Sequence, residues 1–180
     1  HVNHNLRGKE ALSDSKFVEE LCKKRGVPLE IVSADVAAIA MEKKLGLEEC
    51  GRIVRYEAFK KAGCDKIAVA HTLSDSIETS LFNLTRGSSL LGVCGITPTR
   101  NNIIRPLIFC ARDEIIEYCS ENGLEYVTDS SNLTDDYSRN FLRHNVIPLL
   151  KELNPELENS FFRFFKSAGS DDAFLKKTAL

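Results

Sequence analysis

The chain has 180 residues, of which 43% are hydrophobic and 28% charged, and its formal net charge at pH 7 is −2. These values are typical of a globular protein of one domain, or of one domain and part of a second. They exclude a protein that binds polyanions through bulk positive charge, and no apolar run is long enough to predict a membrane span.

Short apolar strands alternate with amphipathic helices in chain order. Strands are predicted at 1–6, 28–32, 66–70, 103–104 and 125–128. Helices are predicted from a cap at Ser13 or Asp14 to Gly26, over 36–44, 47–62, 74–86, 111–122 and 138–152, and from Pro155 onward. The segments 87–102 and 129–137 are predicted to be loops.

This alternation predicts an α/β fold with a doubly wound, mainly parallel sheet. The run KIAVA at 66–70 is typical of a buried parallel strand. Ligands bind at the carboxyl ends of the strands in such sheets, so polar residues that directly follow a strand are the candidates for a site.

The six cysteines are scattered along the chain. None forms a C-x-x-C pair, and none is close to a histidine at the spacing of metal ligands, so neither a zinc ribbon nor an iron–sulfur site is expected. Scattered single thiols are typical of a reducing compartment, and we therefore expect a cytoplasmic protein.

The first candidate site follows the 66–70 strand, where Thr72 and Asp75 have the spacing of a capping box. Asp75 and Glu78 are three residues apart, so they share a helix face and repel each other. A cation between them, either a metal ion or a substrate ammonium, would relieve this repulsion. The alternative is that these acids only complement the helix dipole.

Two further candidates are arginines with few acidic neighbours at helical spacing. Arg55 has none on either side and is free to bind a phosphate. Arg139 and Arg143 share one face beside Asn140, which suits a phosphate or nucleobase site; Asp135 can pair with Arg139. In both cases the alternative is a solvated basic face.

The weakest candidates are single residues and a polar loop. His4 and His71 each follow a predicted strand, although a lone histidine is more often structural. The polar loop 129–132 follows a predicted strand, but side-chain turns explain its composition better than a ligand site does. The phenylalanine-rich last helix is predicted to serve packing.

Five motifs occur in a fixed order over about His1–Pro155: HVNHNLRG, RIVRYEAF, AHTLSDSIETSLFNLTRG, GITPTRNNIIRPL and TDSSNLTDDYSRNFLRH. Together they resemble the N-terminal catalytic domain of the tRNA(Ile)-lysidine synthase family, which belongs to the PP-loop ATP pyrophosphatases. The resemblance implies a Rossmann-like sheet of the adenine nucleotide alpha hydrolase-like type. It implies a catalytic domain over 1–153 and a helical extension over 154–180 that leads towards a C-terminal domain.

The resemblance also implies a reaction. Members of the family are ligases that modify tRNA. With ATP, and assisted by Mg²⁺, they adenylate C2 of the wobble cytidine in the CAU anticodon of tRNA(Ile). The ε-amine of free L-lysine then displaces AMP and leaves lysidine. The expected partners are this tRNA and lysine, with no membrane, and a homodimer is an open expectation.

The resemblance assigns roles to residues that match its motifs. Asp75 and Glu78 would bind lysine, with Asp75 also catalytic. Catalytic roles are also implied for Arg55, at the α-phosphate, and for Arg143, near the cytidine. Nucleotide binding is implied for His4, Arg55 and His71, and tRNA binding for Arg139, Asn140 and Arg143.

The sequence departs from the family pattern at two places. The pyrophosphate loop Ser-Gly-Gly-x-Asp-Ser and the first strand are expected upstream of His1. Thr72, Ser74 and Ser76 replace the second His, the first Asp and the Gln of the family's His-His-x-Asp-Asp-Gln motif. Because a carboxylate is lost, no metal ligand is assigned in this chain.

Two other functions stay open. One is another PP-loop tRNA-modifying enzyme, such as a tRNA thiolase, although the lack of C-x-x-C argues against the iron–sulfur type. The other is a catalytically inactive module that binds nucleotide or tRNA.

Overall fold

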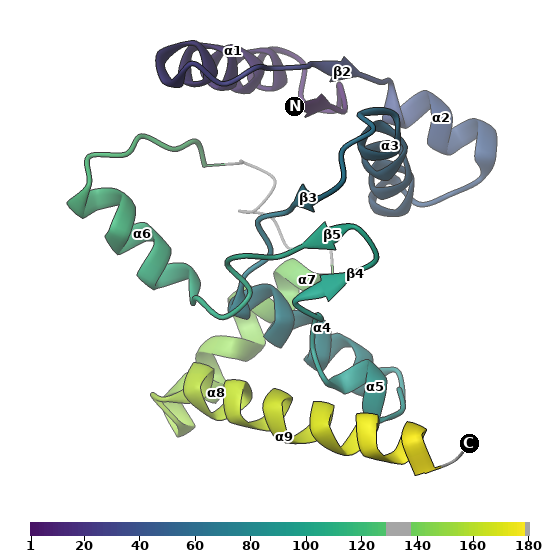
Figure 1. The fold of residues 1–180 in the computed structure, drawn as a ribbon, viewed down its shortest axis with the longest axis vertical. Coiled ribbons are helices and arrows are strands. Elements are labelled where there is room, and N and C mark those ends of the chain that lie inside the picture. The colour runs from purple at the N-terminus through teal and green to yellow at the C-terminus, as the bar shows by residue number, and fades with distance from the viewer. Residues whose placement is uncertain (129–137, 179–180) are drawn as a thin grey trace. The chain divides into compact units, whose positions relative to one another are not determined.

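The computed structural model describes residues 1–128 and 138–178. The chain forms two compact units, His1–Asp65 and Lys66–Leu180, and each is described by itself. Each unit holds one small sheet, which is parallel in the first unit and mixed in the second (Figure 1). None of the helices in the described ranges has both the length and the apolar character needed to cross a bilayer.

The first unit places two helices and a parallel strand pair around a small core. It contains β1 (Val2–Asn3), α1 (Lys9–Arg25), β2 (Val32–Ser33), α2 (Val36–Lys43) and α3 (Leu47–Lys61). The core is formed by α2 and α3 through Val36, Ala40, Cys50 and Val54, all of them buried. The predicted strand–helix order of this unit is confirmed.

The predicted start of the first helix was wrong, because α1 begins at Lys9 and not at a cap on Ser13 or Asp14. Asp14 is instead engaged by Arg7, whose Nη2 lies 2.7 Å from the carboxylate. Gly8 precedes the helix with a φ of 50°, without a side-chain cap. Gly26 ends the helix in the left-handed conformation, as predicted.

The second unit contains β3 (Ile67–Ala68), α4 (Leu73–Thr85), α5 (Leu90–Val93), β4 (Thr99–Arg100), β5 (Ile103–Ile104), α6 (Arg112–Glu121), α7 (Ser138–Phe141), the π-helical turn η2 (Leu142–Val146), α8 (Ile147–Leu153) and α9 (Leu157–Thr178). Its sheet has the order β3-β5-β4. β3 and β5 are parallel, and β4 is antiparallel to β5. The mainly parallel arrangement confirms the prediction.

Three predictions in this unit were wrong. The segment 87–102 is not all loop, because it holds α5 and β4, and β4 forms a hairpin with β5 through Asn101 at a φ of 55°. Residues 125–128 form no strand; they are exposed and pair with no strand of the described chain. The 66–70 run is not buried, since Ala68 on the edge strand β3 and Ala70 just after it are both exposed.

Helix α4 lies at the centre of the second unit. It contacts α5, α7, η2 and α9 (Figure 1). Its buried residues Leu73, Ser76, Ile77 and Ser80 recur at helical spacing and give it one inward face. Burying a side chain such as Ile77 stabilises the fold by about 1.5–3 kcal/mol. The position of α4 is therefore set from several sides at once.

Gly95 allows close packing between α4 and α9. Its φ is +75°, and a Cβ there would lie 3.1 Å from ring atoms of Phe165 and 3.2 Å from Cβ of Ser76. A side chain at position 95 would therefore be strained both by the backbone and by its neighbours.

We expect Gly95→Ala to lower the free energy of unfolding by about 2–4 kcal/mol, measured by urea denaturation. Gly87→Ala is the matched control, since Gly87 has a φ of +72° with open space around it. The control should cost only about 1 kcal/mol from the backbone. Equal losses in the two variants would show that the contact with Phe165 contributes nothing.

Candidate active site

The first turn of α4 is built by the capping box that the sequence predicted. The hydroxyl oxygen of Thr72 accepts a hydrogen bond from the backbone N–H of Asp75 at 3.3 Å. In return, Oδ2 of Asp75 accepts bonds from the Thr72 backbone N–H at 2.7 Å and from its hydroxyl at 2.8 Å. The box fixes Asp75 just beyond the carboxyl end of β3, where the fold predicts a ligand site.

One turn further along α4, Glu78 is only 2% exposed and forms an ion pair with Arg143. Nε of Arg143 donates to Oε1 at 2.6 Å and Nη2 donates to Oε2 at 3.1 Å. Nη2 also lies 3.8 Å from Oδ1 of Asp75. We call Asp75, Glu78 and Arg143 the acid–arginine cluster.

Burial dominates the electrostatics of Glu78. Loss of solvation raises the pKa of its carboxyl above the ordinary 4.5, although the bonds and charge of Arg143 oppose this and Asp75 adds to it. Because the folded pKa is raised, the contribution of this group to stability is complete below pH 4.5 and is lost as the pH rises through the folded pKa. Arg143 limits that loss by binding the charged form.

A cation near Asp75 and Glu78 was one of the two alternatives that the sequence left open, and the chain itself supplies one in Arg143. Of the two carboxylate oxygens of Asp75, Oδ1 has no hydrogen bond to Thr72 or Arg143. The Asp75 side chain is 32% exposed. Both oxygens of Glu78 are occupied by Arg143. An ammonium group can thus approach Asp75 directly, whereas it can reach Glu78 only if Arg143 moves.

Magnesium does not fit this arrangement, because the carboxylates are already bound to Thr72 and Arg143. Across residues 1–128 and 138–178, no group of three His, Cys, Asp or Glu side chains is placed to hold a metal ion. These residues are therefore not assigned as Mg²⁺ ligands.

The other predicted residues of the second unit lie near the cluster along the chain. His71 directly precedes the cap of α4 and is half-buried. Arg139 is half-buried on α7, and its charge also lowers the pKa of Glu78. Asn140 is buried at 8% exposure. The loop 129–132 and Asp135, the predicted partner of Arg139, lie outside the described residues.

In the first unit, His4 lies close enough to Arg55 for its positive charge to act on the ring. The His4 ring lies against Gly51 on α3, and Arg55 follows one turn later on the same helix. Burial, and after it the charge of Arg55, lower the pKa of His4 below 6.5, so the ring is neutral at pH 7. Its Nδ1 is buried without a hydrogen-bond partner, and Arg55 is exposed.

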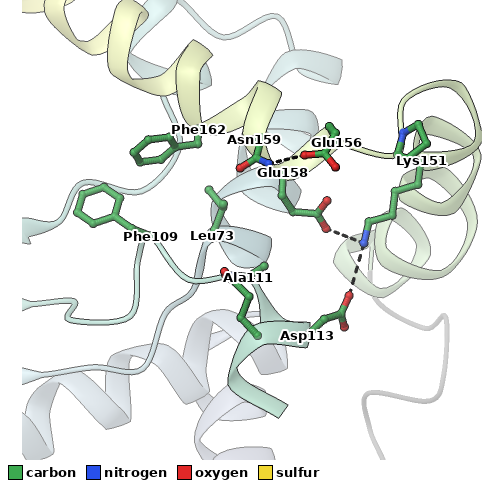
Figure 2. A pocket seen from close by; sticks show the side chains of 11 residues that line it. Leu73, Phe109, Ala111, Asp113, Lys151, Glu156, Glu158, Asn159 and Phe162 are labelled. Atoms are coloured by element: carbon green, nitrogen blue, oxygen red, sulfur yellow. Dashed lines mark hydrogen bonds and ion pairs between the residues drawn. The ribbon is translucent and has the colours of Figure 1, made fainter. Parts of the chain in front are cut away.

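Two features of the second unit were not predicted from the sequence. The first is the pairing of Arg143 with Glu78 across 65 residues, for which the signal was an arginine without a local acid. The second is a pocket of about 450 Å³ between the start of α4, the 109–114 segment and α9. Figure 2 shows Lys151 reaching from α8 to Glu158 at 2.6 Å and to Asp113 at 3.7 Å, with Phe109 and Phe162 on the apolar side.

Comparison with known proteins agrees with the α/β fold of the chain. The PP-loop domain family matches residues 1–150, and the chain belongs to that family. The U34-tRNA thiolase NcsA from Methanococcus maripaludis with its [4Fe-4S] cluster has a similar fold, with a TM-score of 0.67 at 20% identity over 92% of this chain and 59% of that chain. The predicted PP-loop fold is confirmed.

The curated proteins that the chain is similar to carry a more specific name than the family does. The chain is similar to proteins named tRNA(Ile)-lysidine synthase, at 44% identity in Bacteroides thetaiotaomicron (89% of this chain, 38% of that protein) and 41% in Thermosipho africanus (97% and 42%). Similarity to the Bacillus subtilis protein of that name is 38% over 98% of this chain. The chain spans about two fifths of the length of these relatives.

We expect Arg143→Ala to lower the free energy of unfolding at pH 7 by about 2–3 kcal/mol, because it leaves a buried carboxylate without a cation. The loss should shrink as the pH falls, since Glu78 then takes up a proton. Urea denaturation at several pH values measures this. In a Glu78→Gln background the pH dependence of the loss should disappear, and its persistence would assign the effect to another group.

Proposed function

We propose that this protein forms lysidine on tRNA(Ile), using ATP and free L-lysine. The single observation that carries the proposal is the similarity of nearly the whole chain to proteins named tRNA(Ile)-lysidine synthase. The acid–arginine cluster supports it, because it offers an exposed carboxylate beside a held guanidinium. Membership in the PP-loop domain family supports the use of ATP.

The proposed reaction has two steps. The C2 oxygen of the wobble cytidine attacks the α-phosphorus of ATP, so that pyrophosphate leaves and the oxygen carries AMP. The ε-nitrogen of lysine then attacks C2, and the bond from C2 to the oxygen breaks as AMP departs. The nitrogen loses its protons during the reaction, since only the neutral amine has the free electron pair that attacks.

Asp75 is the proposed contact for the lysine ε-ammonium. Its side chain is partly exposed and is fixed by Thr72, so a charged amine would find a carboxylate already in position. A carboxylate beside the ammonium can also take its proton. Glu78 serves the same site, either by binding lysine once Arg143 has moved or by holding Arg143 where it is.

The cationic residues are proposed to meet the phosphates and the RNA. Arg55 is exposed and would contact the α-phosphate, where negative charge builds during adenylation. Neutral His4, together with His71, would line the nucleotide. Arg143, with Arg139 and Asn140, would lie near the cytidine. If Mg²⁺ assists the reaction, its ligands come from groups other than the acid–arginine cluster.

The proposal is tested by incubating the intact protein with ATP, L-lysine and a tRNA that carries a CAU anticodon. We expect release of pyrophosphate and AMP that depends on lysine, and a modified cytidine whose mass has increased by one lysine less water. Transfer of sulfur without any need for lysine would instead make it a thiolase. Nucleotide or tRNA binding without turnover would make it a binding module.

We expect Asp75→Asn to reduce lysine transfer by at least about 100-fold while the Kd for ATP stays within twofold. The asparagine oxygen can still accept the hydrogen bonds from Thr72, so the helix cap is kept. Asp171→Asn is the matched control, because Asp171 is an exposed acid of the same unit. Full activity of Asp75→Asn would remove Asp75 from the mechanism.

We expect Arg55→Ala to weaken ATP binding or adenylation by about 10–100-fold with little change in stability, because the side chain is exposed. Pyrophosphate release and ATP titration separate the two effects. Arg52→Ala, one turn earlier on α3 and also exposed, is the control and should leave both unchanged. If the two variants behave alike, Arg55 has no special role.

A further inference from the structure

We propose that Pro148 is a positioning residue that keeps Arg143 on Glu78 by enforcing the π-helical turn η2. The inference rests on the proposed function for its effect on catalysis, whereas its structural part can be tested without it. Pro148 lies in the first turn of α8, five residues after Arg143.

Proline explains why the helix changes its form at this point. Pro148 has no N–H to donate, and in a continuous α-helix its ring would collide with the carbonyl of His144, four residues earlier. The chain avoids the collision by widening the preceding turn: the N–H of Ile147 bonds to the carbonyl of Leu142, five residues back. Such a turn inserts one extra residue into the helix.

The burial pattern shows that the register is shifted by one residue across this turn. In a continuous α-helix, the residue in phase with buried Leu142 would be Leu149, seven positions on. Leu149 is instead 60% exposed, and Leu150 is the half-buried one. Leu153 lies eleven positions after Leu142, also in phase with it on a continuous helix, and it is 85% exposed.

The extra residue allows two ion pairs to form at the same time, one near each end of the segment 142–153. Arg143, on the π-turn, binds Glu78, and Lys151, on α8, binds Glu158 and Asp113 (Figure 2). A continuous α-helix seated by Lys151 would turn its upstream half by about 100°. That rotation would take Arg143 away from Glu78 and Leu142 out of the core, so the cluster depends on the extra residue.

The first test substitutes Pro148→Ala in the intact protein, which makes the continuous α-helix accessible. We expect kcat for lysidine formation to fall about tenfold, while the Kd for ATP stays within twofold. In an Arg143→Ala background, Pro148→Ala should cause no further loss of kcat, because both changes remove the same contact. Additive losses would mean that Pro148 acts only through general stability and would overturn the proposal.

The second test is a rescue. Deleting the exposed residue Asn145 in the Pro148→Ala background removes the extra residue and should give a regular α-helix with both ion pairs in place. Activity should return to within about twofold of the wild type. Pro155→Ala, which removes a proline between α8 and α9, is the control and should not affect kcat. Failure of the deletion to restore activity would contradict the register argument.

A third measurement is independent of catalysis. The destabilisation caused by Arg143→Ala should be at least halved in the Pro148→Ala background, and restored in the variant that also lacks Asn145. If the wild-type protein makes no lysidine, the proposed function fails, and this coupling still tests the role of Pro148. An unchanged effect of Arg143→Ala in all backgrounds would overturn it.

Discussion

A carboxylate that is nearly excluded from water must either meet a cation or carry a proton, and this constraint organises the second unit. Glu78 meets Arg143 through two hydrogen bonds. The pair joins α4 to the π-turn that follows α7, and it sets how far Arg143 lies from Asp75. The local charge of the candidate site is therefore a property of the packing between two helices.

Helix α4 contributes both to the packing of the second unit and to the candidate site. Its inward face holds Ile77 and Ser76 against the rest of the unit, while its first turn presents Asp75 at the end of β3. The two roles use different faces and turns of one helix. A rigid element of this kind places a functional side chain more accurately than a loop does.

Local features of the sequence predicted the parts of the structure that depend on local interactions. The capping box of Thr72 and Asp75, the end of α1 at Gly26 and the shared face of Asp75 and Glu78 need only neighbours within a few residues, and all three are present. The five ordered motifs likewise predicted the PP-loop family correctly.

The failures came where distant residues decide the structure. Asp14 was expected to cap a helix but binds Arg7 instead, and residues 125–128 had strand character but no neighbouring strand in the described chain. The partner of Glu78 is 65 residues away, so helical spacing could not identify it. The predicted helix over 138–152 includes Pro148 without an interruption. The sequence shows that a proline is present, but it does not show that the preceding turn widens to accommodate it.

The two oxygens of the Asp75 carboxylate make different contacts, and this limits which residues can replace Asp75. One oxygen closes the helix cap through Thr72, and the other lies 3.8 Å from Nη2 of Arg143. A longer acid at this position would present its charge further out, but it would also have to reach back to the Thr72 amide. A substitution of Asp75 by an apolar residue would therefore change the charge of the cluster and the cap of α4 together.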